Sequence, residues 1–304
     1  MVIREVGHSV GVRGGRVRTV LLAAAAAGLV AGALTGCSGS GSSSADAAGA
    51  AKAADSSDVL SADPLTAVRS AADITGRTGY VQDATTLQTV SATKKMTLHG
   101  TATYDYSTRL GLMVITIPPG EGTTGKLTEV VSPGVVYMQN SGAKVPAGKW
   151  VEVNVQQLSD GNLVSSGATD PASAANALRG AQTAKLVGSS TVGGVVLKHY
   201  QGTLDLATAA NATGGGAATG LSLAAQTFTV KQVPYQVWLD QHGRIHEIVE
   251  TFTFSQKPGS TAAKDQVVVT STSEFSDYGT PVQVSMPKPS EVYGAEPSAK
   301  ASSK

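Results

Sequence analysis

The chain has 304 residues, of which 15% are charged, with 23 basic side chains, 22 acidic side chains and one cysteine. This near balance leaves no basic field to attract nucleic acid, and no block of like charge predicts a polyelectrolyte partner. One cysteine cannot form an intramolecular disulfide, so an exported domain would have to rest on its hydrophobic core. Frequent Ala, Gly, Ser, Thr and Val favour strands joined by modest turns.

The first residues combine a basic segment with an apolar run. The run spans residues 20–33, about 14 residues, and ends in Leu34-Thr35-Gly36-Cys37. A transmembrane helix is the alternative interpretation, but a span needs about 20 apolar residues, whereas a signal peptide needs fewer. The pattern resembles a bacterial lipoprotein signal with its lipobox. The basic residues before the run are Arg4, Arg13, Arg16 and Arg18.

This resemblance implies that residues 1–36 are a signal peptide and that Cys37 carries a diacylglyceryl group. Two acyl chains give a stable anchor, so the protein is expected on the outer face of the cell membrane. Residues 1–36 hold four basic and one acidic residue, so the mature chain keeps 19 and 21, a net charge of −2. Residues 37–60 are mostly Ser, Gly and Ala and predict a flexible tether with a reach of roughly 25–30 Å.

Two helices begin with the same signal, an aspartate at the N-cap followed by proline at the first helical position. Asp63-Pro64 predicts a helix that ends at Gly76 or Gly79, and Asp170-Pro171 predicts one that ends near Arg179-Gly180.

The remaining pattern is dominated by strands. Ser132-Pro133-Gly134 and Asp240-Gln241-His242-Gly243 predict tight turns between neighbouring strands. Residues 207–224 predict an irregular surface insertion, and residues 293–304 a disordered tail. Strands are expected over residues 95–106, 110–117, 126–131, 135–139, 149–153, 195–206, 228–240, 244–254 and 266–275.

These elements predict an α+β fold built on one long antiparallel meander of roughly 8–11 strands. A meander of this length tends to curl. We therefore expect a half-open barrel whose concave face is covered by helices.

Five stretches of the body resemble the LppX/LprG-type lipoproteins of actinobacteria, within the LolA/LolB-like superfamily. They are GVVYM (134–138), GKWVE (148–152), VGGVVLKHY (192–200), VWLDQHGRI (237–245) and FSDYGTPV (275–282). The resemblance covers residues 61–292. It implies a half-open antiparallel β-barrel of the LolA type and a hydrophobic cavity that holds the acyl chains of a lipid or glycolipid.

Residues expected to line such a cavity are large apolar groups on the predicted strands. Each of them has an alternative role in an ordinary core. They are Leu112, Val114, Tyr137, Trp150, Leu204, Trp238, Ile248, Phe252 and Phe254.

Motifs for other chemistry are weak. The loop from Gly120 to Leu127 nearly matches a phosphate loop, but Leu127 stands where Ser or Thr would bind magnesium. His242 and His246 would lie about 13 Å apart on a strand, too far for one metal ion. No Gly-x-Ser-x-Gly elbow occurs in the body. We therefore expect no enzyme activity, no metal and no cofactor.

The predicted function is that of a membrane-anchored extracytoplasmic protein that binds and carries lipid or glycolipid without catalysis. The alternative is a sensor or interaction module on the same scaffold, which would regulate or assist a membrane partner such as a transporter. A deep pocket would favour carriage, and a flat apolar patch near residues 207–224 would favour a protein partner.

Overall fold

The computed structural model describes residues 60–119, 125–140, 145–164, 169–257 and 259–294. Cys37, the predicted signal peptide and nearly all of the predicted tether therefore lie outside the described residues, as does the predicted tail from residue 295 onward. Of the glycine-rich loop at 120–127, residues 125–127 are described. They begin a strand, which confirms that no helix follows this loop.

The described chain forms one open antiparallel sheet of eleven strands, in the order β6-β5-β4-β3-β2-β1-β11-β10-β9-β8-β7. Strands β6 and β7 are its two edges, so the sheet is not closed. The predicted half-barrel is confirmed. The strands are β1 (Tyr80–Val90), β2 (Lys95–Asp105), β3 (Leu110–Ile117), β4 (Gly125–Ser132), β5 (Val135–Gln139), β6 (Trp150–Asn154), β7 (Lys185–Val192), β8 (Val195–Leu204), β9 (Val233–Leu239), β10 (Ile245–Ser255) and β11 (Gln266–Ser276).

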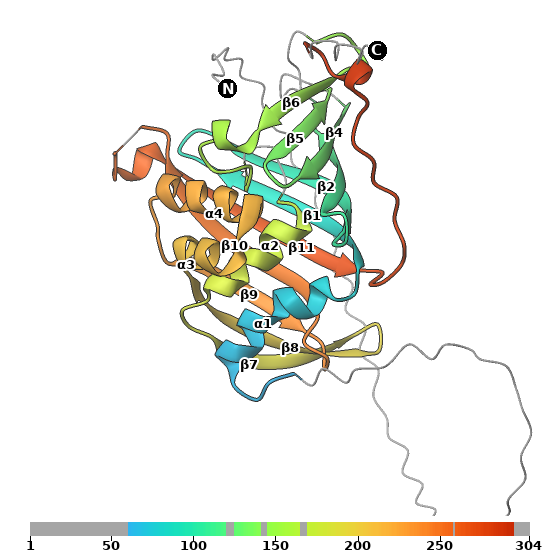
Figure 1. Cartoon of the computed structure of the whole chain (residues 1–304). Helices are drawn as coiled ribbons and strands as arrows, with labels where there is room; N and C mark the ends of the chain where they lie inside the picture. Colours follow the sequence, from blue (N-terminus) through green and yellow to red (C-terminus); the bar gives the residue numbers. More distant parts are fainter. Residues whose placement is uncertain (1–59, 120–124, 141–144, 165–168, 258, 295–304) are drawn as a thin grey trace, which may run out of the picture. The chain divides into compact units, whose positions relative to one another are not determined.

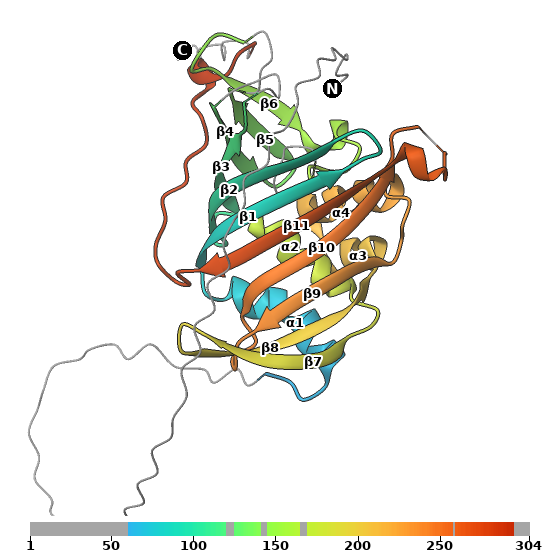
Figure 2. The ribbon, with the colours of Figure 1, turned by 180° about the vertical axis from the view of Figure 1, so that it is seen from behind.

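All helices pack on one face of this sheet, which we call the inner face (Figure 1), and the outer face is seen from behind (Figure 2). The helices are α1 (Pro64–Gly76), α2 (Pro171–Ala177), α3 (Leu206–Thr213) and α4 (Gly215–Thr227). Short 3-10 turns occur at η1 (Val155–Gln157), η2 (Leu178–Gly180), η3 (Ala263–Asp265) and η4 (Pro289–Glu291).

The two aspartate-proline signals start helices as predicted. Asp63 accepts a hydrogen bond from the backbone N–H of Thr66 at 2.8 Å and caps α1. Asp170 caps α2, which continues through the turn η2 to Gly180. Because the cap satisfies N–H groups that have no partner inside the helix, the start of each helix is fixed locally.

The prediction of an irregular insertion at residues 207–224 is wrong, because these residues form most of α3 and α4. Asp205 caps α3 by accepting a hydrogen bond from Thr208 N at 2.7 Å, and Gly214, with φ of 77°, separates the two helices. Alanine has the highest helix propensity, and Leu206 and Leu221 are buried against the rest of the domain.

Two strands were not predicted, and one starts later than expected. β1 carries polar Asp83 and Thr85 on its buried face, which breaks the hydrophobic alternation. β7 (KLVGSSTV) lacks the alternation of polar and apolar residues by which a half-buried strand is predicted, and every one of its residues is exposed. β9 begins only at Val233, because Phe228 ends the α4 segment and makes an isolated bridge to Phe254.

The connections between strands alternate between the two ends of the sheet. The β2–β3, β4–β5, β7–β8 and β9–β10 turns all lie at one end. At this end the backbone N–H of Leu60, the last residue of the predicted tether, donates to Gln241 O in the β9–β10 turn at 3.0 Å. We call it the tether end.

The last described segment runs from β11 to the β6 edge of the sheet (Figure 2). Val292 forms a parallel bridge with Trp150, and Tyr293 N donates to Trp150 O at 2.8 Å. This segment therefore covers part of one edge strand. Among the described residues, none of the helices combines the length and the hydropathy that a bilayer crossing requires.

Candidate functional site

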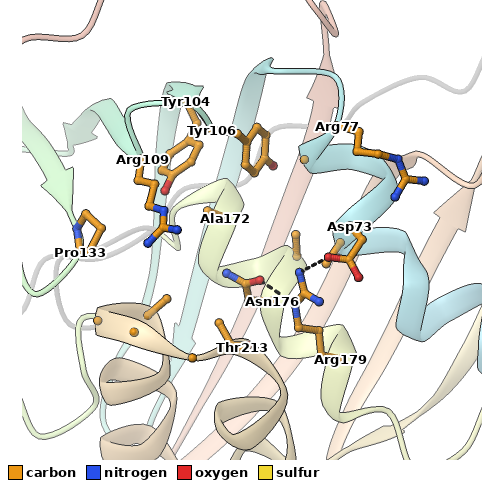
Figure 3. Close-up of a pocket in the computed structure, with 17 residues that line it drawn as sticks. Asp73, Arg77, Tyr104, Tyr106, Arg109, Pro133, Ala172, Asn176, Arg179 and Thr213 are labelled. Atoms are coloured by element: carbon orange, nitrogen blue, oxygen red, sulfur yellow. Dashed lines mark hydrogen bonds and ion pairs between the residues drawn. The ribbon is translucent and has the colours of Figure 1, made fainter.

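A cleft of about 480 Å³ lies between the helices and the tether end of strands β2–β5 (Figure 3). Volumes of this size are typical of small-molecule sites. Its walls come from α1, α2, the end of β2, two strand turns and the α3–α4 connection. The lining residues are Ala72, Asp73, Gly76, Arg77, Tyr104, Tyr106, Arg109, Pro133, Ala172, Ala175, Asn176, Arg179 and 213–217.

Three arginines from three separate elements line the cleft. Arg77 ends α1, Arg109 lies in the β2–β3 turn and Arg179 follows α2. Asp73 is the one carboxylate in the lining, so the formal charge of the cleft is +2. The mature chain is expected to carry −2, which makes the cleft a local exception and a place where an anion is favoured.

Arg179 is held in place by its neighbours. Its Nη2 donates to Asp73 Oδ1 at 2.7 Å, and its Nε donates to Asn176 Oδ1 at 2.9 Å. The hydrogen bond from Arg179 holds the pKa of Asp73 below its usual value, so this carboxylate stays charged. A guanidinium fixed in this way presents its remaining N–H groups in a defined direction.

Helix α4 begins at the cleft with an N-terminus that no side chain caps. Its N-cap is Gly214, and Gly214, Gly215 and Gly216 all line the cleft. Gly214 and Gly215 have φ of 77° and 63°, a region that favours glycine. A Cβ on Gly216 would lie 2.9 Å from the backbone carbon of Pro133, so glycine also permits this close approach. The open N–H groups add to the positive potential of the arginines.

An apolar crevice of about 70 Å³ adjoins the cleft beneath α4. It shares part of its wall with the cleft, including Tyr104 and Ala172, and it continues along Val136, Leu163 and Leu221, with Asp170 and Asn162 among its polar members. The site therefore combines a cationic cleft at the surface with a narrow, mainly apolar crevice between the helices and the sheet.

Two tyrosines form the β2 side of the cleft (Figure 3). The rings of Tyr104 and Tyr106 meet edge to face, with centroids 4.9 Å apart. The Tyr106 hydroxyl is shielded from solvent and has no hydrogen-bond partner in the described part of the chain. Burial raises the pKa of both tyrosines above the usual range, so both remain neutral hydrogen-bond donors.

Buried carboxyl groups lie deeper, between the helix layer and the sheet. Burial raises the pKa of Glu250 on β10 to about 8, and its oxygens have no hydrogen-bond partner among the described residues. Burial, and then the charge of Asp170, raise the pKa of Asp83 well above its usual value. Burial also raises the pKa of Asp170, although its Oδ1 accepts hydrogen bonds from two α2 backbone N–H groups. In all three groups burial disfavours the charged form of the carboxyl, which is why the pKa shifts upward.

The nine predicted cavity residues are divided between the two faces of the sheet and its edge. Leu204, Ile248 and Phe252 are fully buried in the core of the inner face, and Phe254 packs against this core. Leu112 and Val114 alternate with inner residues and line a shallow hollow on the outer face. None of the nine lines the cationic cleft. Their contact with a ligand stays a prediction.

The other three lie near the surface. Tyr137 donates a hydrogen bond to Glu152 at 3.1 Å, and Trp150 is on the edge strand β6. Trp238 stacks on His199 with ring centroids 4.0 Å apart. The predicted set thus missed the cleft, whose arginines are more than 30 residues apart in sequence and form no local motif.

The histidines that were weighed as metal ligands have structural partners. His246 Nε2 lies 3.4 Å from Asp240 Oδ2, and Asp240 also accepts hydrogen bonds from the backbone N–H groups of His242 and Arg244. Within the described ranges, no three His, Cys, Asp or Glu residues are grouped as they would be around a metal ion.

Solved structures with a similar fold include lipoprotein LppX from Mycobacterium tuberculosis. It is 13% identical, with a TM-score of 0.43, over 73% of this chain and 97% of that chain. LprF from Mycobacterium bovis is 13% identical, with a TM-score of 0.42, over 75% of this chain and 99% of that chain. The resemblance expected from the sequence is confirmed, and at these identities it concerns the fold alone. Neither a family model nor a curated protein sequence matches this chain.

Proposed function

We propose that this protein is an extracytoplasmic lipoprotein, anchored through a diacylglyceryl group on Cys37, that binds a lipid or glycolipid and carries it without breaking a bond. The supporting observation is the cationic cleft that continues into an apolar crevice. Such a gradient suits an amphiphile whose headgroup is anionic, for example a phosphate diester. Arg109 and Arg77 would bind its oxygens, together with the N–H groups of Arg179 that Asp73 leaves available.

The cleft accommodates a headgroup, but the adjoining crevice admits only the first part of an acyl chain. The rest of the chain needs space between the helix layer and the sheet. Helix α2 buries only Pro171 and four alanines of its own against its surroundings, so its side chains do not interlock deeply with the sheet. The buried Glu250 would regain water in the same movement. We therefore propose that α2 and α4 move away from the sheet when a lipid enters.

The anchor and the ligand have to be separated in any test, because both are lipids. A chain that starts at residue 37 and carries Cys37→Ser keeps every described residue and has no acyl group of its own. Mass spectrometry of organic extracts from this protein is expected to find a bound amphiphile. In cells, the full chain with Cys37→Ser is expected to lose membrane retention or processing.

Binding of fluorescent phosphatidylglycerol tests the role of the arginines. The double variant Arg77→Gln/Arg109→Gln is expected to bind about tenfold more weakly than the parent, because two charge-assisted contacts are lost. The matched control is Lys126→Gln, an exposed cation at the far end of β4. Absence of any extracted lipid, together with equal affinity in parent and double variant, would refute the carrier function.

The alternative of a sensor or interaction module predicted an exposed apolar patch near residues 207–224. In that segment Leu221 is buried and Leu223 is half-buried. The exposed apolar side chains gather instead on another element, the β7–β8 hairpin.

A further inference from the structure

The β7–β8 hairpin presents an unusual apolar surface. Of the nine large apolar side chains that are exposed in the described part of the chain, five belong to this hairpin. Its turn is Gly193-Gly194, with φ of 57° and 83°, the conformation of a tight two-residue hairpin turn. Three of the five flank this turn: Val192, Val195 and Val196, with exposed fractions of 60%, 36% and 56%.

The charge of the hairpin has one sign. Residues 181–204 include Lys185 and Lys198 and no aspartate or glutamate. Lys198 lies two residues from Val196, whereas Lys185 pairs with Gln201 at the other end of the hairpin. The apolar tip therefore has one cation close by and no acidic residue of the hairpin beside it. Exposed apolar side chains beside a cation, without an acidic neighbour in the hairpin, suit the interface of an anionic membrane.

The tip projects from the tether end of the sheet. Lys198 pairs with Leu239, and Gln241 follows two residues later in the turn that binds Leu60. Val195 lies three residues beyond Lys198 in the same direction, or about 10 Å along the strand. The tip and the point where the predicted tether enters the domain are thus on the same side (Figure 1).

The cationic cleft is lined in part by residues of this end as well. Arg109 and Tyr106 belong to the β2–β3 turn region and Pro133 to the β4–β5 turn, both at the tether end. The hairpin tip and these lining residues of the cleft thus belong to the same end of the strands.

We propose that the tip of the β7–β8 hairpin inserts its valines into the surface of the membrane that holds the Cys37 anchor, and turns the cleft mouth toward that membrane. The inference rests on the proposed lipid anchor. A predicted tether with a reach of roughly 25–30 Å keeps the hairpin at a high effective concentration near the bilayer, so weak insertion is sufficient.

A partner strand added to β7 is the competing occupant of this edge. The register of β7 against β8 shifts between Leu186 and Gly188, and such an irregularity twists an edge and interrupts a ladder. The position of the apolar residues at the tip, beside the tether, also favours a lipid surface over a strand.

Vesicle sedimentation tests this docking without the anchor. The chain from residue 37 with Cys37→Ser is mixed with vesicles of equal parts phosphatidylglycerol and phosphatidylcholine at low and high salt. We expect salt-sensitive binding, and we expect Val192→Ser/Val195→Ser/Val196→Ser to lower the partition coefficient at least tenfold. The control is Val90→Ser/Val230→Ser, which changes two valines that are 39% and 40% exposed at the opposite end of the sheet.

Thermal unfolding verifies that all variants fold, and lipid extraction from the triple variant separates the two proposals. Docking is supported if the parent binds vesicles, the triple variant does not, and both proteins yield the same amount of extracted lipid. The docking proposal is overturned if the parent does not bind vesicles or if the triple variant binds them equally well. It is also overturned if the parent self-associates without binding vesicles and the triple variant loses this self-association. If no lipid is extracted from the parent, that result counts against the carrier function and leaves the docking proposal unaffected.

Discussion

Replacing Glu250 by glutamine should make the protein more stable at neutral pH and leave it unchanged in acid. The folded protein keeps the proton of Glu250 up to a pKa of about 8, because the carboxyl is buried, whereas the unfolded chain releases it near 4.5. At pH 7 unfolding therefore releases this proton, and the release favours the unfolded state. Stability is lost as pH rises above 4.5 and stops falling above 8.

The magnitude follows from the interval between 4.5 and pH 7. At 1.36 kcal/mol for each pH unit, the parent loses about 3 kcal/mol of unfolding free energy through this group between pH 4 and pH 7. Glu250→Gln has nearly the same shape and no charge, so it should exceed the parent by about 3 kcal/mol at pH 7 and equal it at pH 4. Asp83 and Asp170 titrate in both proteins and cancel from the difference.

Urea unfolding of the two proteins between pH 4 and pH 8, followed by circular dichroism, measures this difference. The control is Glu152→Gln, which removes a carboxylate from the edge strand β6, where water reaches it. Parallel curves for parent and Glu250→Gln over the whole pH range would refute the reasoning, because they would show that Glu250 is hydrated in the folded protein.

Two further substitutions test how the helix layer is held. Gly180→Ala should lower the free energy of unfolding by more than about 2 kcal/mol, since the added Cβ would lie 2.1 Å from Asp205 O. The control Gly188→Ala, whose Cβ would have nothing within 4 Å, should change it by less than about 1 kcal/mol, and equal effects of the two substitutions in urea unfolding would contradict the close packing at Gly180. Asp170→Ala should lower the free energy of unfolding by about 1–2 kcal/mol because the α2 cap is lost, whereas Asp170→Asn should retain most of the parent's stability, because asparagine caps equally well. An equal loss of stability in the asparagine variant would show that the charge of Asp170, and not its cap, is responsible.

The elements that could be predicted are those whose signals are local. Asp63-Pro64 and Asp170-Pro171 define helix starts within four residues, and the turn at residues 240–243 ends in Gly243 with φ of 85°. The half-barrel followed from the number of short strands and the short turns between them. These features need no knowledge of which strands lie side by side.

What could not be predicted depends on distant parts of the chain. Residues 207–224 lack an apolar stripe, and their helices are stabilised by alanine propensity and by packing on a surface that the sequence does not reveal. Strand β1 is polar on its buried face because Asp83 and Thr85 lie beneath the helix layer. Arg77, Arg109 and Arg179 come together only in the folded protein, so their spacing along the chain does not predict the cleft.

The two edges of the sheet also set a limit on self-association. A polymer that grows by adding sheet to sheet needs a free strand on both sides of every copy. Among the described residues, Val292 and Tyr293 occupy part of the β6 edge at Trp150, and no strand pairs with the outer side of β7. Two copies that met through β7 would present only their partly covered β6 edges for further growth, and removal of the C-terminal segment would uncover these edges fully and favour longer assemblies.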